Sequence, residues 1–207
     1  MTQPRLRRVL AVAVAAAALS LAACAPPGQE GQPGVAAVYN GTTFTNSDLD
    51  AVHEAWRVGT NGNDVPRRQQ ILTIELMREP AIEAVRELGY TFSDQEISAL
   101  AAQWLEYLRV DAEPTGEFAL AVEGVYAIAA LVALDPSMQV IYGIAVDVEE
   151  SAVLSPRSGS FTANAFMKSV EDARTAAIAQ DLGSRFYIEF QHVNGFERVA
   201  TPWIDNG

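Results

Sequence analysis

The chain has 207 residues, 49% of them hydrophobic, and a formal net charge of −12. This charge disfavours nucleic acids and anionic lipid headgroups as partners, because both are themselves negatively charged. With a single cysteine the chain cannot close a disulfide of its own. It contains no Walker-type loop, dinucleotide-binding fingerprint or Gly-x-Ser-x-Gly motif.

The N-terminal segment is typical of an export signal. Three arginines precede an uncharged run from Val9 to Ala23, which is short for a helix that must cross about 30 Å of hydrocarbon. The sequence Leu-Ala-Ala before Cys24 resembles the lipobox of bacterial lipoproteins, in which the thiol is acylated and the signal peptide is then cut before the cysteine. We therefore expect residues 1–23 to be a signal peptide and Cys24 to carry the lipid, palmitate included. The alternative is a plain secretory signal that leaves a free thiol.

This interpretation places the protein on the cell membrane, facing the extracytoplasmic or periplasmic side. Residues 24–34 are rich in Pro, Gly and Gln and predict a flexible tether. Beyond residue 23 the chain keeps all 26 acidic residues and 11 of its 14 basic ones, a net charge of −15. For the remainder we predict a helical domain over residues 35–160 and a C-terminal extension over residues 161–207.

The predicted domain opens with a short strand and a helix. The stretch from Val35 to Asn40 is apolar and partly β-branched, and Asn40-Gly41 is a strong tight-turn signal. Ser47 lies three residues before Asp50, which predicts a capping-box start for a helix from Asp48 to Val58.

Two further helices follow. Asp64 is predicted to cap the second one, Pro80 to kink or break it, and Gly89 to end it. Ser93 and Glu96 form a second capping box, which opens a helix with apolar residues at helical spacing. Those residues are Ile97, Leu100, Ala101, Trp104, Leu105 and Leu108.

The next segments are strongly apolar. The run from Glu117 to Leu134 is apolar nearly all round, so it is either a core helix or a helix that presents apolar surface. The run from Met138 to Val148 fits both a buried helix and a strand. Residues 152–155 are predicted to be extended.

The C-terminal extension is predicted to hold a helix and a hairpin. Residues 169–182 form an Ala-rich helical pattern. Apolar and polar residues alternate from Phe186 to Val193, and Asn194-Gly195 is a turn signal. With a return strand from Phe196 to Trp203, this pattern predicts a C-terminal β-hairpin.

Catalytic and metal-binding chemistry is poorly supported by the sequence. His53 and His192 are the two histidines, and neither has carboxylates at the spacing of a zinc site. We therefore predict no metal, no cofactor and no catalytic residue. Two histidines would still permit a Ser-His-Asp arrangement, so a hydrolase is kept as a third and more distant hypothesis.

Large apolar side chains gather in and after the third predicted helix. Two interpretations are open: they pack in the core, or they line a groove that holds unfolded polypeptide, since large exposed apolar patches usually mark binding sites. The candidate client-binding residues are Trp104, Tyr107, Leu108, Phe118 and Tyr126.

Three successive stretches carry a family resemblance: "VAAVYNGTTFTNSDLDAV", "RRQQILTIELMREPAIEAVRELGY" and "TFSDQEISALAAQW". In this order they resemble the N-terminal domain of SurA-type chaperones, shared in outline by PrsA-like foldases, over about Val35 to Leu108. The resemblance implies a mainly α fold whose first strand pairs with a late strand. It also implies that the domain handles unfolded or nascent exported polypeptides. The proline-isomerising parvulin domain of full-length relatives is not evident, so we do not expect an enzyme.

Two functional hypotheses follow. The first is a lipid-anchored extracytoplasmic chaperone-like protein that binds unfolded or extended polypeptides and assists the folding of exported proteins. The alternative is an envelope lipoprotein that scaffolds one fixed protein partner and has no chaperone activity.

Overall fold

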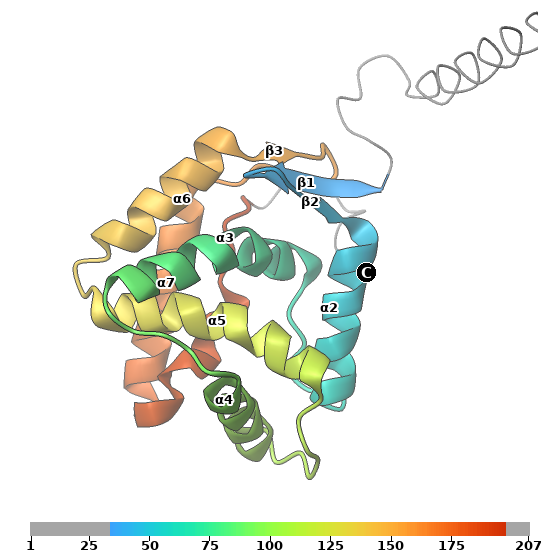
Figure 1. Cartoon of the computed structure of the whole chain (residues 1–207), viewed down its shortest axis with the longest axis vertical. Coiled ribbons are helices and arrows are strands. Elements are labelled where there is room, and N and C mark those ends of the chain that lie inside the picture. The colour runs from blue at the N-terminus through green and yellow to red at the C-terminus, as the bar shows by residue number, and fades with distance from the viewer. Residues whose placement is uncertain (1–33, 198–207) are drawn as a thin grey trace, which may run out of the picture. The chain divides into compact units, whose positions relative to one another are not determined.

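The computed structural model describes residues 34–197 (Figure 1). These residues form six α-helices, one 3-10 helix and a three-stranded antiparallel sheet. The predicted mainly α class is therefore confirmed. The predictions for the signal peptide, Cys24, the tether and residues 198–207 lie outside the described part of the chain.

The sheet joins the first segment of the domain to a late one. Strands β1 (Val35–Tyr39), β2 (Thr42–Thr45) and β3 (Val153–Leu154) lie in the order β2-β1-β3. Asn40 and Gly41 connect β1 to β2, and both have positive φ, at 48° and 76°, as two-residue hairpin turns require. The predicted pairing between the first strand and a late strand is confirmed, because β1 also pairs with β3.

Helix α2 (Asn46–Gly59) begins earlier than predicted, and its cap is Thr45. The Thr45 hydroxyl accepts a hydrogen bond from the Asp48 amide at 3.1 Å, while the Asp48 carboxylate accepts one from the Thr45 amide at 2.8 Å. The predicted cap at Ser47 is therefore wrong. Strand β2 runs directly into the helix, so Ser47 already lies inside the first turn.

The N-cap residue predicted for helix α3 (Arg68–Glu87) is also wrong. Its N-cap residue is Arg67, whose amide donates to the side chain of Gln70. Asp64 instead bonds to the side chain of His192. Pro80 lies within α3, and the chain leaves the helix through Gly89 at a φ of 88°, which confirms the predicted stop.

Helices α4 and α5 build the centre of the domain. Helix α4 (Asp94–Tyr107) starts at the predicted cap, where the Ser93 hydroxyl accepts from the Glu96 amide. Helix α5 (Gly116–Leu134) packs against α2, α3, α4 and η1, so it is the core helix of the two alternatives. By length and composition it is also the one helix of the described residues that could span a membrane.

Two segments of the second half of the chain are helical where a strand was one of the alternatives or was predicted. The apolar run after Asp135 is helix α6 (Gln139–Ser151), not a strand, and it is followed by α7 (Ala163–Ala179). Residues 183–192 form the 3-10 helix η1 (Gly183–His192), so the predicted C-terminal hairpin is wrong.

The burial pattern of η1 explains that error. Tyr187, Ile188, Phe190 and Gln191 are all buried, and pairs of positions three residues apart recur on one face of a 3-10 helix. Phe196, the first residue of the predicted return strand, forms an isolated antiparallel bridge with Phe161, and residues 198–203 lie outside the described part of the chain. Residues from both the predicted domain and the predicted extension therefore contribute to one hydrophobic core.

Candidate functional site

Two of the five predicted client-binding residues lie in the core. Trp104 and Phe118 have no exposed surface. Both rings pack edge-on against Trp56, with centroid distances of 5.0 Å to Trp104 and 5.2 Å to Phe118. The core-packing interpretation therefore describes these two residues, and they do not line a binding surface.

The other three predicted residues are partly buried. The hydroxyl of Tyr107 contacts the side chain of Gln180, and Leu108 packs against the core. Tyr126 borders a cavity of about 210 Å³, whose lining also includes Tyr90, Phe186 and Tyr187. The structure thus brings Tyr126 together with aromatic residues that were not among the predicted client-binding residues.

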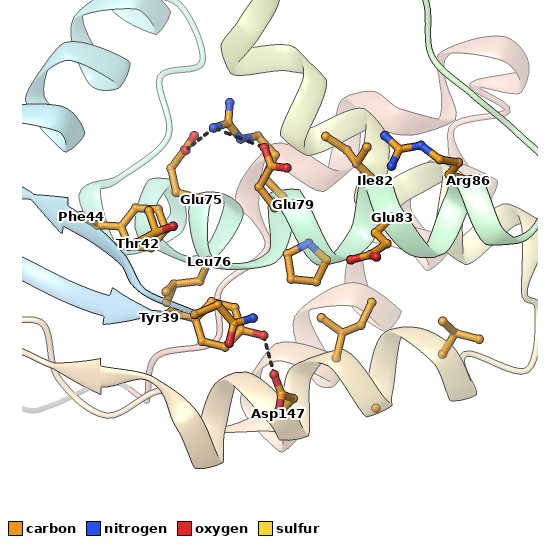
Figure 2. Close-up of a pocket in the computed structure, with 16 residues that line it drawn as sticks. Tyr39, Thr42, Phe44, Glu75, Leu76, Glu79, Ile82, Glu83, Arg86 and Asp147 are labelled. Atoms are coloured by element: carbon orange, nitrogen blue, oxygen red, sulfur yellow. Dashed lines mark hydrogen bonds and ion pairs between the residues drawn. The ribbon is translucent and has the colours of Figure 1, made fainter.

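A larger cavity of about 670 Å³ lies between α3 and α6, next to the turn between β1 and β2 (Figure 2). We call it the α3–α6 groove. Its lining mixes apolar side chains with charged ones. The lining residues are Tyr39, Asn40, Thr42, Phe44, Glu75, Leu76, Arg78, Glu79, Pro80, Ile82, Glu83, Arg86, Val140, Gly143, Ile144 and Asp147.

Helix α3 contributes an acidic row to this groove. Glu75, Glu79 and Glu83 repeat at intervals of four residues, a spacing that places them on one helix face. A guanidinium nitrogen of Arg78 lies 3.6 Å from Glu75 and 3.9 Å from Glu79. These three residues form a small ionic group at one side of the groove.

The carboxyl of Glu75 is largely buried, with 11% of its side chain exposed. Burial raises the pKa of Glu75 above its usual value, Arg78 opposes this shift, and the nearby Glu79 and Glu123 add to it. The buried wall of the groove therefore disfavours additional negative charge.

Pro80 also faces the groove and changes the backbone of α3. Proline has no amide hydrogen, so it cannot donate to the carbonyl oxygen four residues earlier, which belongs to Leu76. Both residues line the groove. The α3 wall consequently includes a backbone acceptor that has lost its helical donor.

Helix α6 and strand β1 form the opposite wall. The hydroxyl of Tyr39 donates a hydrogen bond of 2.6 Å to Asp147. Burial, together with this bond, raises the pKa of Tyr39. Along α6, Gly143 lies between Val140 and Asp147. A Cβ atom added at Gly143 would meet no atom within 4 Å. This wall therefore leaves open space in front of α6.

The charge of the groove is negative. Four carboxylates face two guanidinium groups, those of Arg78 and Arg86, which gives a net charge of −2. Figure 2 shows Glu83 on the side of α3 toward α6, whereas Arg86 lies on the far side. The carboxylate of Glu83, and not the guanidinium of Arg86, therefore lies toward α6.

Neither histidine belongs to this groove. His53 lies on α2, and His192 at the end of η1 contacts an oxygen of Asp64 at 2.9 Å. Within residues 34–197 no three His, Cys, Asp or Glu side chains are grouped so that they could hold a metal ion.

Part of this groove was visible in the sequence. The interval of four residues between Glu75, Glu79 and Glu83 would have placed them on one face of a predicted helix. Nothing in the sequence indicated that Asp147 or Gly143 lies opposite, because the segment around them fitted both a helix and a strand.

Comparison of the chain with protein-family models, with curated proteins and with solved structures gives no match. The resemblance to SurA-type chaperones therefore stays a prediction.

Proposed function

We propose that the protein is a lipid-anchored extracytoplasmic chaperone, related to the SurA-type domain, that binds unfolded or extended polypeptides and assists the folding of exported proteins. The observation that carries this proposal is the α3–α6 groove, with its volume of about 670 Å³ and its mixed lining. A cavity of this size lies in the range of ligand-binding sites in proteins.

The apolar part of the lining suits side chains of an unfolded client. Helix α3 contributes Leu76, Pro80 and Ile82 to this lining, and helix α6 contributes Val140 and Ile144. Unfolded polypeptides expose apolar side chains that folded proteins bury. Covering such a side chain with apolar surface lowers the free energy. The groove offers apolar contacts on two facing helices.

The backbone around the groove suits an extended segment. Strand β2 lies at one edge of the sheet, and Thr42 and Phe44 of this strand line the groove. An extended peptide can add to an edge strand through main-chain hydrogen bonds, which do not depend on its sequence.

The proposed location depends on the N-terminal sequence. Acyl chains on Cys24 would hold the protein at the membrane, and stable anchoring requires more than one chain. The negative charge of the remaining chain would keep the domain away from anionic headgroups. The protein would then be located where exported polypeptides leave the export machinery.

The experiment compares the full chain, purified in detergent, with two glycine variants. Gly143→Trp fills the groove, whereas Gly116→Trp adds the same side chain at the start of α5, outside the groove. A Cβ atom is accommodated at both positions. Each protein is added to several unrelated unfolded proteins, and their aggregation is followed by light scattering.

We expect the wild type and Gly116→Trp to suppress aggregation and Gly143→Trp to lose most of this activity. An indole adds apolar surface, which by itself would favour client binding, so the loss would report a blocked groove. If no unfolded protein is protected and one tight partner is recovered from cross-linked membranes, the fixed-partner scaffold is the better description.

A further inference from the structure

We infer that the α3–α6 groove selects extended segments in which a lysine or arginine adjoins an apolar side chain. This inference rests on the proposed function, because it specifies which clients the same groove prefers. It is carried by the charges that face each other across the groove.

Two carboxylates of the lining, those of Glu83 and Asp147, lie on the facing sides of the groove (Figure 2). They come from facing helices, α3 and α6. Among residues 34–197 neither carboxylate forms an ion pair with a lysine or arginine. A cation from a bound segment would therefore meet charge that the described part of the protein does not neutralise.

The apolar residues lie beside these carboxylates. Pro80 is one turn from Glu83 on α3, and Ile144 is one turn from Asp147 on α6. A long basic side chain buries its methylene groups on apolar surface while its charge stays at the rim. The arrangement thus matches a segment that alternates apolar and basic residues.

Acidic segments are disfavoured by the negative charge of the groove and of the whole chain. The buried carboxyl of Glu75 has a raised pKa because burial and neighbouring carboxylates oppose its ionisation. A further carboxylate in the groove would add to this repulsion. The net charge of −12 on the whole chain acts in the same direction at longer range.

The test uses three labelled peptides of equal length with the same apolar core, flanked by Lys, Gln or Glu. Binding to the full chain in detergent is measured by fluorescence anisotropy at low and high salt. We expect the Lys peptide to bind about fivefold more tightly than the Gln peptide at low salt, the size of two exposed ion pairs. The Glu peptide should bind most weakly, and the three affinities should converge as salt screens the charges.

The double variant Glu83→Gln, Asp147→Asn should remove the preference for Lys, so that the Lys and Gln peptides bind the variant with equal affinity. The amide oxygen of Asn can still accept from Tyr39, so the fold is retained, which thermal unfolding checks. The matched control Glu171→Gln, Asp181→Asn removes the same charge from exposed positions outside the groove and should keep the preference.

The outcomes separate the two proposals. Equal affinity for the three peptides would overturn this inference and leave the proposed function intact. An equal loss of preference in the control variant would also overturn it, because the overall charge would then be the cause. If none of the peptides binds, the groove is not a polypeptide site and the proposed function fails with it.

Discussion

The hydroxyl of Tyr39 donates a hydrogen bond of 2.6 Å to Oδ2 of Asp147, which links β1 to α6 at the rim of the α3–α6 groove. Tyr39 is itself 5% exposed, so its ring is held in the core while its hydroxyl reaches the rim. This contact connects the sheet to one wall of the candidate site.

Tyr39→Phe should lower the free energy of unfolding by about 1 kcal/mol, because it deletes this hydrogen bond and keeps the ring. Urea denaturation measures the effect. Tyr142→Phe is the control, since Tyr142 lies on α6, the helix of Asp147, and is 44% exposed; it should change the stability little. The pKa of Tyr39 is raised in the folded state, which predicts how the stability depends on pH. The stabilisation by the protonated hydroxyl is present below pH 10 and is lost as the pH rises through the folded-state pKa.

Asp64→Asn should weaken the contact between the α2–α3 loop and η1. Burial raises the pKa of Asp64, but hydrogen bonds from His192 and Gln191 outweigh burial and hold the pKa below 3.8. A lowered pKa means that the ionised carboxylate stabilises the folded state above its ordinary pKa and that this stability is lost on acidification. Wild type and variant should therefore differ at neutral pH and converge in strong acid.

Thermal unfolding between neutral and acidic pH tests this expectation. Asp181→Asn is a matched control, because Asp64 and Asp181 both have positive φ, at 57° and 52°, and asparagine tolerates that conformation. Asp181 is exposed, so its substitution should leave the pH profile unchanged. An identical profile for Asp64→Asn would show that the contact with His192 contributes nothing.

Gly195→Ala should be strongly destabilising. An added Cβ atom would collide with the ring of Phe161, and the Gly195 amide also donates to the buried hydroxyl of Thr73 at 3.0 Å. Overpacking of this kind costs about 1–3 kcal/mol. Gly143→Ala is the opposite case, because nothing lies near its Cβ and alanine stabilises a helix interior by about 0.5–1 kcal/mol. Chemical denaturation of both variants should give shifts of opposite sign.

Cys24→Ala tests the lipid anchor. If Cys24 is acylated, the variant should fail to incorporate a labelled fatty acid and should leave the membrane fraction. Wild-type protein processed in the same cells is the control. Membrane association of the variant that still requires detergent would contradict the lipoprotein prediction.

Local signals in the sequence predicted much of the fold. The Asn40-Gly41 turn, the Ser93 cap and the Gly89 stop each depend on a few neighbouring residues, and all three are present in the structure. The caps at Ser47 and Asp64 were wrong because a competing residue was available nearby in one case, and a distant partner, His192, in the other.

Long-range contacts account for the remaining errors. The alternation after Phe186 resembles a strand, but Tyr187 packs against Trp104 and Tyr126, and this packing favours a 3-10 helix. The same reason applies to the candidate site. The acidic row on α3 follows from its spacing, whereas the approach of Asp147 depends on how α6 lies against α3.

The pairing of Ala37 with Leu154 has a consequence for the order of folding. If the chain crosses the membrane from its N-terminus, β1 emerges long before β3. During that interval β1 has only β2 as a neighbour, and a two-stranded hairpin alone is marginally stable. In that case the sheet would be complete only after α6 has been delivered, and the protein would itself pass through a partly folded state at the membrane.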